Sequence, residues 1–300
     1  MPESGGGADL YAGWVDPGGV GAQTAGAGPT RRRRGAHMLL GGGLLVGYVA
    51  LAALGPWLAP YGANEQDLLG VLAPASAEHW LGTDQIGRDL LSRIVVGARF
   101  TLTAALVSVI LAASVGATVG LVAGYFGGRI DGGLMAVADL LLTVPNLILA
   151  IAIASVIGAG MTGLIVATTT SFVAPVARLI RGRVLEVRQE DFVQAARAVG
   201  VRDARILARH VLPHATTTLV IETSLLAGQA VLIGSALGFL GLGVRPPAPE
   251  WGTMLSGGRE FIEVAPHLVV APGVAISLLV FAFNVFGDGL RDRLDPRRHA

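Results

Sequence analysis

The sequence predicts an all-α, polytopic membrane protein with six transmembrane helices. Of its 300 residues, 52% are hydrophobic and 14% are charged, and the mean hydropathy is +0.63. A soluble domain is typically about 25% charged. Charge-poor runs of about 20 residues, the length that a helix needs to cross the hydrocarbon core, recur along the chain. Both observations indicate a protein that lies mostly within a lipid bilayer.

The expected spans follow one another along the chain at about 38–58, 100–126, 134–157, 162–180, 216–241 and 265–287. The third and fourth are separated at the small-residue turn GAGMTG (158–163), because the uncharged run from Leu140 to Ala177 is too long for one crossing. That turn also fits the glycine pattern of dinucleotide-binding loops, but it joins two spans rather than a strand and a helix, so we expect no nucleotide site there. Residues 1–34 are expected to form a disordered cytoplasmic tail, and residues 35–300 the transmembrane domain.

The arginines predict the orientation in the membrane. They supply all 22 basic residues of the chain. With the N-terminus inside, 17 of them fall on cytoplasmic segments and 5 on outer segments, and cytoplasmic loops carry the excess of positive charge in membrane proteins. We therefore expect a multi-pass protein of the inner membrane with both termini in the cytoplasm, together with a polar insert at 190–213.

Composition also excludes several kinds of chemistry. The chain has no cysteine, so disulfides and thiolate metal sites are excluded. It has no lysine, and a Walker A phosphate loop requires one. His210 and His214 are four residues apart, as in some metal sites, but Pro213 lies between them and is expected to break the helix. We expect a non-catalytic protein that binds no metal and no cofactor, and that has no nucleic-acid partner.

The polar insert EDFVQAARAVGVRDARILARHVLP (190–213) predicts two short amphipathic helices. An apolar stripe at helical spacing marks the first, formed by Phe192, Ala195, Ala196 and Val199. Gly200 is placed to end this helix in a left-handed cap. The second has a stripe of Ala204, Leu207, Ala208 and Val211, and Pro213 is expected to stop it. These residues leave two interpretations open: a helix pair resting on lipid headgroups, or a docking element for a cytoplasmic partner.

The insert resembles the loop that marks the membrane subunits of binding-protein-dependent ABC importers. That pattern is Glu-Ala-Ala, three residues, Gly, nine residues, Ile, any residue, Leu-Pro. Gln194 stands here in place of the glutamate and His210 in place of the isoleucine, so a salt bridge made by that glutamate is in doubt. The other pattern positions match at the correct spacing, at Ala195, Ala196, Gly200, Leu212 and Pro213.

Four further segments resemble the dipeptide/oligopeptide/nickel permease family of the DppC/OppC type. They are HWLGTDQIGRDLLSRIVVGAR (79–99), AGYFGGRID (123–131), GFLGLGVRPPAPEWGTML (238–255) and FNVFGDGLRDRLDPR (283–297). The resemblance covers about residues 37–297, and its motifs occur in the family's order.

The resemblance implies a type I ABC importer permease fold and a division of labour among subunits. The insert would be a coupling-helix loop that docks on an ATPase, and a second homologous permease would complete the pathway. One or two cytoplasmic ATPase subunits would bind ATP and Mg, and an extracytoplasmic binding protein would deliver di- or oligopeptides. The residues implied for coupling are Asp191, Phe192, Gln194, Ala195, Ala196, Arg197, Gly200, Leu212 and Pro213.

Three alternatives remain open at this point. The first is an importer of the same family for nickel chelates or another small solute. The second is a secondary transporter driven by an ion gradient, with Asp139 or Glu222 as its proton site. The third, a membrane scaffold without transport, is disfavoured by the outer hairpins and the docking loop.

Charged and polar residues within the spans are costly, so they need a physical reason. Glu222, Gln229 and Ser235 in the fifth span are candidate pathway residues, and an interhelical partner for Glu222 is the alternative. Asp139 is expected near the cytoplasmic end of the third span, where it would have a helix-end role.

The outer hairpin 244–264 is a candidate contact for the binding protein, through Trp251 and Arg259, or simply a packing cap over the spans. Arg88 is expected to form a local salt-bridged cluster with its acidic neighbours Asp84 and Asp89. A stripe of small residues at every fourth position is expected to let two helices pack closely. It consists of Ala112, Gly116, Gly120 and Gly124.

Overall fold

A computed structural model describes residues 31–294, and the regular secondary structure in this range is helical, with one isolated β-bridge between Thr83 and Asp89 in the connection 59–89. The predicted tail at 1–34 lies outside the described residues, except for its last four positions, with which the first helix begins. The elements are α1 (Arg31–Leu58), α2 (Leu90–Phe126), α3 (Gly128–Leu142), α4 (Asn146–Ile157), α5 (Met161–Val187), α6 (Asp191–Ala198), α7 (Asp203–Ile206), a π-helical turn (Leu207–Val211), α8 (Leu212–Phe239), α9 (Trp251–Gly258), a 3₁₀ turn (Arg259–Phe261) and α10 (His267–Leu294).

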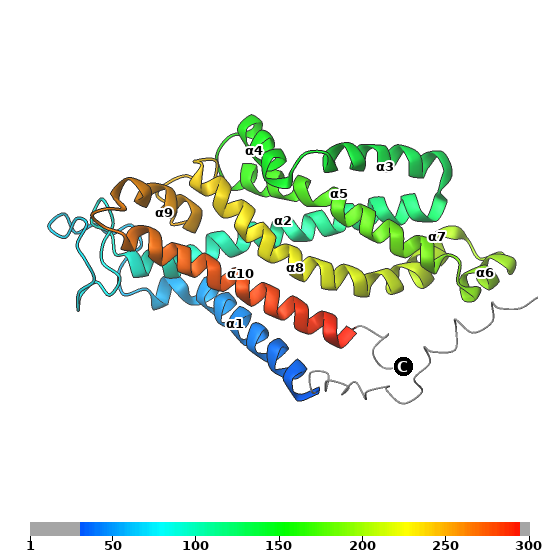
Figure 1. The fold of residues 1–300 in the computed structure, drawn as a ribbon, viewed down its shortest axis with the longest axis horizontal. Helices are drawn as coiled ribbons and strands as arrows, with labels where there is room; N and C mark the ends of the chain where they lie inside the picture. The colour runs from blue at the N-terminus through cyan, green and yellow to red at the C-terminus, as the bar shows by residue number, and fades with distance from the viewer. Residues whose placement is uncertain (1–30, 295–300) are drawn as a thin grey trace, which may run out of the picture.

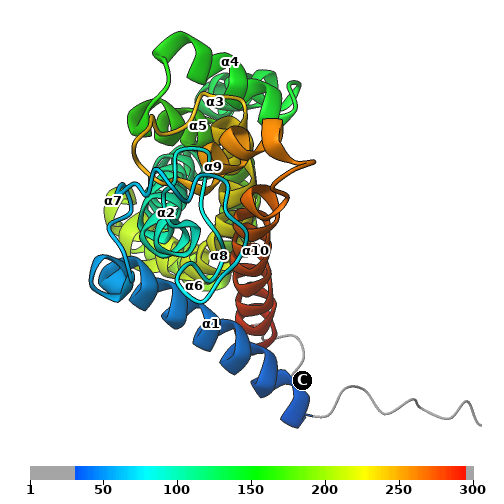
Figure 2. The same cartoon turned by 90° about the vertical axis from the view of Figure 1, so that its left-hand side faces the viewer.

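The long helices run roughly along one axis, with α2 in the interior of the bundle (Figure 1). Helices α6 and α7 lie at one end, which we call the α6–α7 end. Helix α9 and the connection 59–89 lie at the other end, the α9 end. Seen toward the α9 end, α1 crosses the bundle beside α10, and α3 and α4 cover the opposite side (Figure 2).

Among residues 31–294, five helices are long and apolar enough to cross a membrane, or six spans if α3 and α4 together are counted as one. The third span, expected as one helix over 134–157, is instead broken by a 92° bend. The break falls at Pro145, whose ψ of 136° is extended. Proline disfavours the helical conformation of the residue before it and cannot donate a backbone hydrogen bond, so one continuous helix is interrupted here.

Helix α2 begins ten residues before the expected start at 100. Its N-cap is Asp89, whose Oδ2 accepts a hydrogen bond from the Ser92 N–H at 2.7 Å. The sequence-based boundary followed the last arginine, Arg99. In the structure the first turns of α2 continue into the polar loop at the α9 end, where Arg93 is buried against that loop. A charge-based boundary misses such an extension because the arginine is compensated by tertiary contacts.

The second helix of the insert does not stop at Pro213, which corrects the prediction. Helix α7 passes through the π-helical turn directly into α8, and Pro213 lies in the first turn of α8. Proline is tolerated in a first turn because its missing N–H has no required partner there. The insert is therefore joined to the long helix α8 without a loop.

The small-residue stripe on α2 packs closely against α5, as predicted. A Cβ atom added at Gly120 would lie 2.5 Å from the Ala177 carbonyl oxygen. Added at Gly116, it would lie 2.8 Å from the Val173 carbonyl oxygen. The two backbones thus approach more closely than any side chain would allow, and this contact fixes α5, which leads into the insert, against the centre of the bundle.

Candidate functional site

The α6–α7 helix pair is anchored to the bundle by three fully buried side chains, namely Val193, Ile206 and Val211. Ile206 and Val211 are five residues apart and would point about 140° apart on an α-helix. The π-helical turn between them brings residues five apart to the same side. The sequence-based stripe of the second helix missed Ile206 for this reason, since it assumed a period of 3.6 throughout.

Gly200 separates the two short helices as predicted. Its φ of +77° is left-handed, and its N–H donates to the Arg197 carbonyl oxygen at 2.9 Å. The next N–H, of Val201, donates to the Ala196 carbonyl oxygen at 3.1 Å. These bonds satisfy the last carbonyls of α6 and turn the chain sharply into α7.

The predicted apolar stripe of α6 faces outward for most of its length. Phe192 is 39% exposed and Val199 is 79% exposed, and Ala195 between them is exposed as well. Val193, which the stripe omitted, faces the bundle instead and is fully buried. Helix α6 thus presents a largely exposed apolar strip while Val193 holds its other side in place.

A polar cluster ties the pair to the end of α2. The Tyr125 hydroxyl donates to Asp203 Oδ1 at 2.5 Å, and the guanidinium of Arg197 lies 4.9 Å from the centre of the Tyr125 ring. Arg188 donates from Nη1 to the Gly124 carbonyl oxygen at 2.9 Å. Sequence analysis did not find Tyr125 or Asp203, because they lie 78 residues apart and only the fold brings them together.

The first turn of α8 lies beside α6. The Phe192 ring stacks on the His214 ring at a centroid distance of 5.1 Å, and Leu212 and Pro213 are exposed nearby in the same turn.

Gln194, which replaces the glutamate of the family pattern, makes a local contact that explains the replacement. Its Nε2 donates to the Arg188 carbonyl oxygen at 3.0 Å. An ionised glutamate could not donate this bond.

A groove of about 990 Å³ lies between α5, α8 and the end of α10, and we call it the Glu222 groove. Glu222 lines it, and no described side chain of residues 38–294 pairs with its carboxylate, so this part of the chain supplies no interhelical partner. Arg183 and Arg291 also line it, so the groove carries both signs of charge.

The other two candidate pathway residues lie apart from this groove. Gln229 is exposed on α8 about two helical turns after Glu222, but it does not line the groove. Ser235 is buried near the α9 end and borders a very small void together with Glu250. Burial raises the pKa of Glu250, although its carboxylate caps α9 by accepting from the N–H groups of Gly252 and Thr253.

Asp139 lies at a helix end but is paired there with a residue of another helix. It lies in the last turn of α3, close to the break before α4, and forms an ion pair with Arg178 of α5. The expected helix-end position is thus found at the end of α3, whereas the expected cytoplasmic location stays a prediction. Both side chains are more than half exposed.

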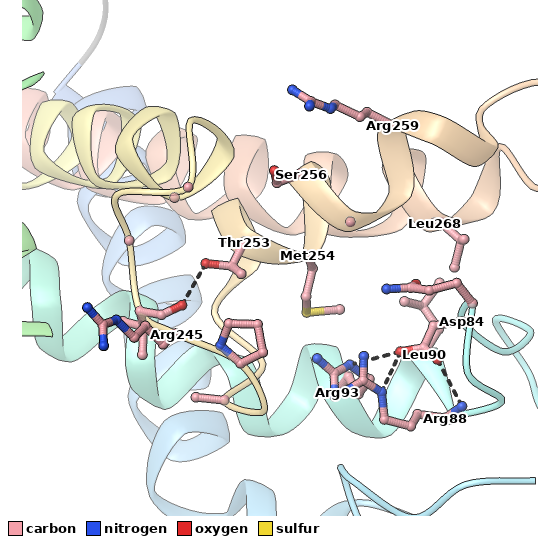
Figure 3. A pocket seen from close by; sticks show the side chains of 18 of the residues that line it. Asp84, Arg88, Leu90, Arg93, Arg245, Thr253, Met254, Ser256, Arg259 and Leu268 are labelled. Atoms are coloured by element: carbon pink, nitrogen blue, oxygen red, sulfur yellow. Dashed lines mark hydrogen bonds and ion pairs between the residues drawn. The ribbon is translucent and has the colours of Figure 1, made fainter. Parts of the chain in front are cut away.

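A second cavity, of about 340 Å³, opens at the α9 end, and we call it the arginine pocket (Figure 3). Arg88 and Arg93 reach the same carboxylate from one side: their Nε atoms lie 2.6 and 3.5 Å from Asp84 Oδ2. Arg245 and Arg259 lie at opposite edges of the pocket. The predicted cluster around Arg88 is confirmed for Asp84, whereas Asp89 contacts His79 instead and caps α2.

The two candidate contacts on the hairpin differ in accessibility. Trp251 has no exposed surface and donates from Nε1 to the Ile94 carbonyl oxygen at 3.0 Å. It therefore fixes α9 onto α2 and presents no surface to a partner in this structure. Arg259 is exposed, and its guanidinium lies 5.9 Å from the Phe239 ring centre.

Comparisons with known proteins give one consistent result. Residues 116–300 match the family model described as "Binding-protein-dependent transport system inner membrane component". The chain is 41% identical over 269 residues to the glutathione transport system permease protein GsiD of Escherichia coli (strain UTI89 / UPEC). It is 40% identical to GsiD of Shigella dysenteriae serotype 1 (strain Sd197). Each alignment covers 89% of this chain and 89% of the relative.

Solved structures agree at the level of the fold. The CY5 native crystal form of the MetNI methionine ABC transporter, in inward-facing conformations, matches with a TM-score of 0.56 and 22% identity. This match covers 69% of the present chain and 98% of the solved one. The CY5 selenomethionine soak form gives a TM-score of 0.55. The helical arrangement is therefore that of an ABC importer permease.

Proposed function

The chain belongs to the family of binding-protein-dependent transport system inner membrane components, and on this premise we propose that its α6–α7 pair docks on an ATPase subunit. Members of the family are non-catalytic, multi-pass permeases of ABC importers that carry no cofactor of their own and work alongside ATPase subunits. Family membership gives no support to the ion-gradient and scaffold alternatives.

One observation carries the docking proposal: α6 presents an exposed apolar strip although the helix pair is attached to the bundle at several points. The buried Val193 holds α6 against the bundle, the Tyr125–Asp203 bond joins the pair to α2, and the π-helical turn joins it to α8. A surface that only rests on lipid headgroups would not need such attachment. A force applied at Ala195 would instead reach two spanning helices directly, as coupling to a nucleotide cycle requires.

We infer that the α6–α7 end lies in the cytoplasm. The N-terminal end of α1, the end of α10 and the junctions of α5 and α8 with the insert all lie at or toward this end (Figure 1). These segments include most of the 17 arginines assigned to the inside. The α9 end then faces outward, where an extracytoplasmic binding protein would dock. Both chain termini would be cytoplasmic.

We propose that the cargo is a peptide or a peptide-like solute and that Glu222 lines its route. The GsiD relatives are glutathione permeases by name, and glutathione is peptide-like. The Glu222 groove combines an unpaired carboxylate with arginines, so it offers complementary charges to a zwitterionic peptide. A second homologous permease would form the opposite wall.

Uptake into proteoliposomes tests this function. The complex would contain this chain, its partner permease and its ATPases, with the binding protein outside and the proton gradient collapsed. We expect ATP-dependent uptake of labelled glutathione or dipeptides, and reduced uptake with Glu222→Gln at unchanged complex yield. Preferential uptake of a nickel chelate would instead identify the same-family alternative. Unchanged peptide uptake and ATPase coupling with Glu222→Gln would remove the pathway role of Glu222.

A further inference from the structure

The arginine pocket contains more positive than negative charge, because four arginines line it (Arg88, Arg93, Arg245 and Arg259) against two acidic residues, Asp84 and Glu260. Arg88 and Arg93 have side chains that are 9% and 6% exposed, and both approach Asp84, whose side chain is 5% exposed. Two nearly buried guanidinium groups therefore share one carboxylate. A buried charge without compensation is costly, so this arrangement favours an additional anion.

The carboxylate of Asp84 has little capacity left to accept further hydrogen bonds. Its Oδ1 accepts from the backbone N–H groups of Ile86 and Arg88, both at 3.0 Å, and its Oδ2 accepts from Arg88 Nε. No oxygen of residues 31–294 accepts from the two terminal nitrogens of Arg88. These nitrogens belong to a residue that lines the pocket, so they are donors available to a ligand that enters it.

The remaining walls suit a short side chain that ends in a carboxylate. Leu90, Met254 and Leu268 supply apolar surface, and Ser256 supplies a hydroxyl group. Methylene groups would pack on the apolar surface while the carboxylate meets the guanidinium groups, which bind carboxylates in a fixed geometry. Arg245 and Arg259 at the edges add positive charge that would steer an acidic partner toward the opening.

The location separates this pocket from the Glu222 groove. The two cavities share no lining residue, and they lie toward opposite ends of the bundle. The arginine pocket therefore lies at the end where the binding protein would dock, and we take a side chain of that protein, rather than cargo, as its occupant. We propose that the arginine pocket receives an aspartate or glutamate side chain of the extracytoplasmic binding protein. This inference rests on the proposed function, in which the α9 end faces outward.

Direct removal of Arg88 would disturb a buried network, so the decisive variants are placed at Ser256. Ser256→Glu brings a carboxylate of this chain to the pocket, where it would compete with the partner's carboxylate. Ser256→Gln adds nearly the same volume without charge and is the matched control. Both variants retain Asp84 and the two buried arginines.

The measurement is the affinity of the loaded binding protein for the complete transporter in nanodiscs, at several salt concentrations. We expect Ser256→Glu to weaken binding by about tenfold or more and to flatten its salt dependence, whereas Ser256→Gln changes affinity by less than about threefold. Equal affinities of the two variants would overturn the inference. Loss of direct cargo binding with Ser256→Glu, at unchanged binding-protein affinity, would also overturn it and would identify cargo as the ligand.

The wild-type complex separates failure of this inference from failure of the proposed function. If the binding protein neither binds wild type nor stimulates its ATP hydrolysis, the proposed function itself is contradicted. If it binds wild type and Ser256→Glu equally well, the importer function stands and the role of the arginine pocket does not.

Discussion

Replacing Gly120 with alanine should loosen the contact between α2 and α5. The new Cβ would lie 2.5 Å from the Ala177 carbonyl oxygen, about 0.9 Å short of the 3.4 Å at which such contacts become ordinary. It would also lie 2.9 Å from the Arg181 backbone nitrogen, so rotation of a side chain cannot relieve the clash. The two helices would have to separate, and overpacking of this kind costs about 1–3 kcal/mol.

The matched control is Gly132→Ala in α3, where an added Cβ meets no atom within 4 Å. Both substitutions gain the same intrinsic helix propensity, about 1 kcal/mol. Their difference therefore isolates the packing term, and we expect Gly120→Ala to be less stable than Gly132→Ala by about 1–3 kcal/mol. The measurement is unfolding in mixed dodecyl maltoside and SDS micelles, followed by circular dichroism. Equal unfolding midpoints would refute the close-packing argument.

Tyr125→Phe removes the hydrogen bond to Asp203 but keeps the ring next to the guanidinium of Arg197. The complex should therefore still assemble, while binding-protein-stimulated ATP hydrolysis falls. Unchanged stimulation would contradict a positioning role for Tyr125. Gly200 has a left-handed φ of +77°, which asparagine tolerates and valine does not. Gly200→Val should therefore reduce ATP-coupled uptake strongly, and Gly200→Asn only weakly. Equal effects of the two substitutions would show that the left-handed cap does not matter. Burial raises the folded-state pKa of Glu250 above its usual 4.5, so the folded protein loses stability as pH rises from about 4.5 through that raised pKa. The stability of wild type relative to Glu250→Gln should therefore increase when thermal unfolding is measured at progressively lower pH, and an opposite trend would contradict the burial effect.

Local sequence patterns predicted much of the fold. Charge-poor runs located every spanning segment, and the spacing at Gly116 and Gly120 predicted a close helix contact that the structure confirms. Gly200 was identified as a helix end from its place after an apolar stripe. These features depend on composition and spacing within one turn or one span, so they are visible without tertiary information.

Features set by tertiary contacts were missed or misplaced. The start of α2 was set too late because the structure buries Arg93 against a distant loop. The break at Pro145 was overlooked because hydropathy continues across it. Trp251 was considered as an outer contact, yet its indole is buried against α2. The Tyr125–Asp203 bond joins segments with no sequence pattern in common.

Docking of the α6–α7 pair on an ATPase subunit is tested most directly at Ala195. This residue is exposed on the apolar strip of α6, whereas Val193 holds the other side of the helix. Ala195→Arg should abolish co-purification of the ATPase and binding-protein-stimulated ATP hydrolysis, while Ala195→Ser, which keeps a small side chain, should retain both. Full ATPase binding and stimulation in the Ala195→Arg complex would contradict the docking role and leave the helix pair as an interfacial element.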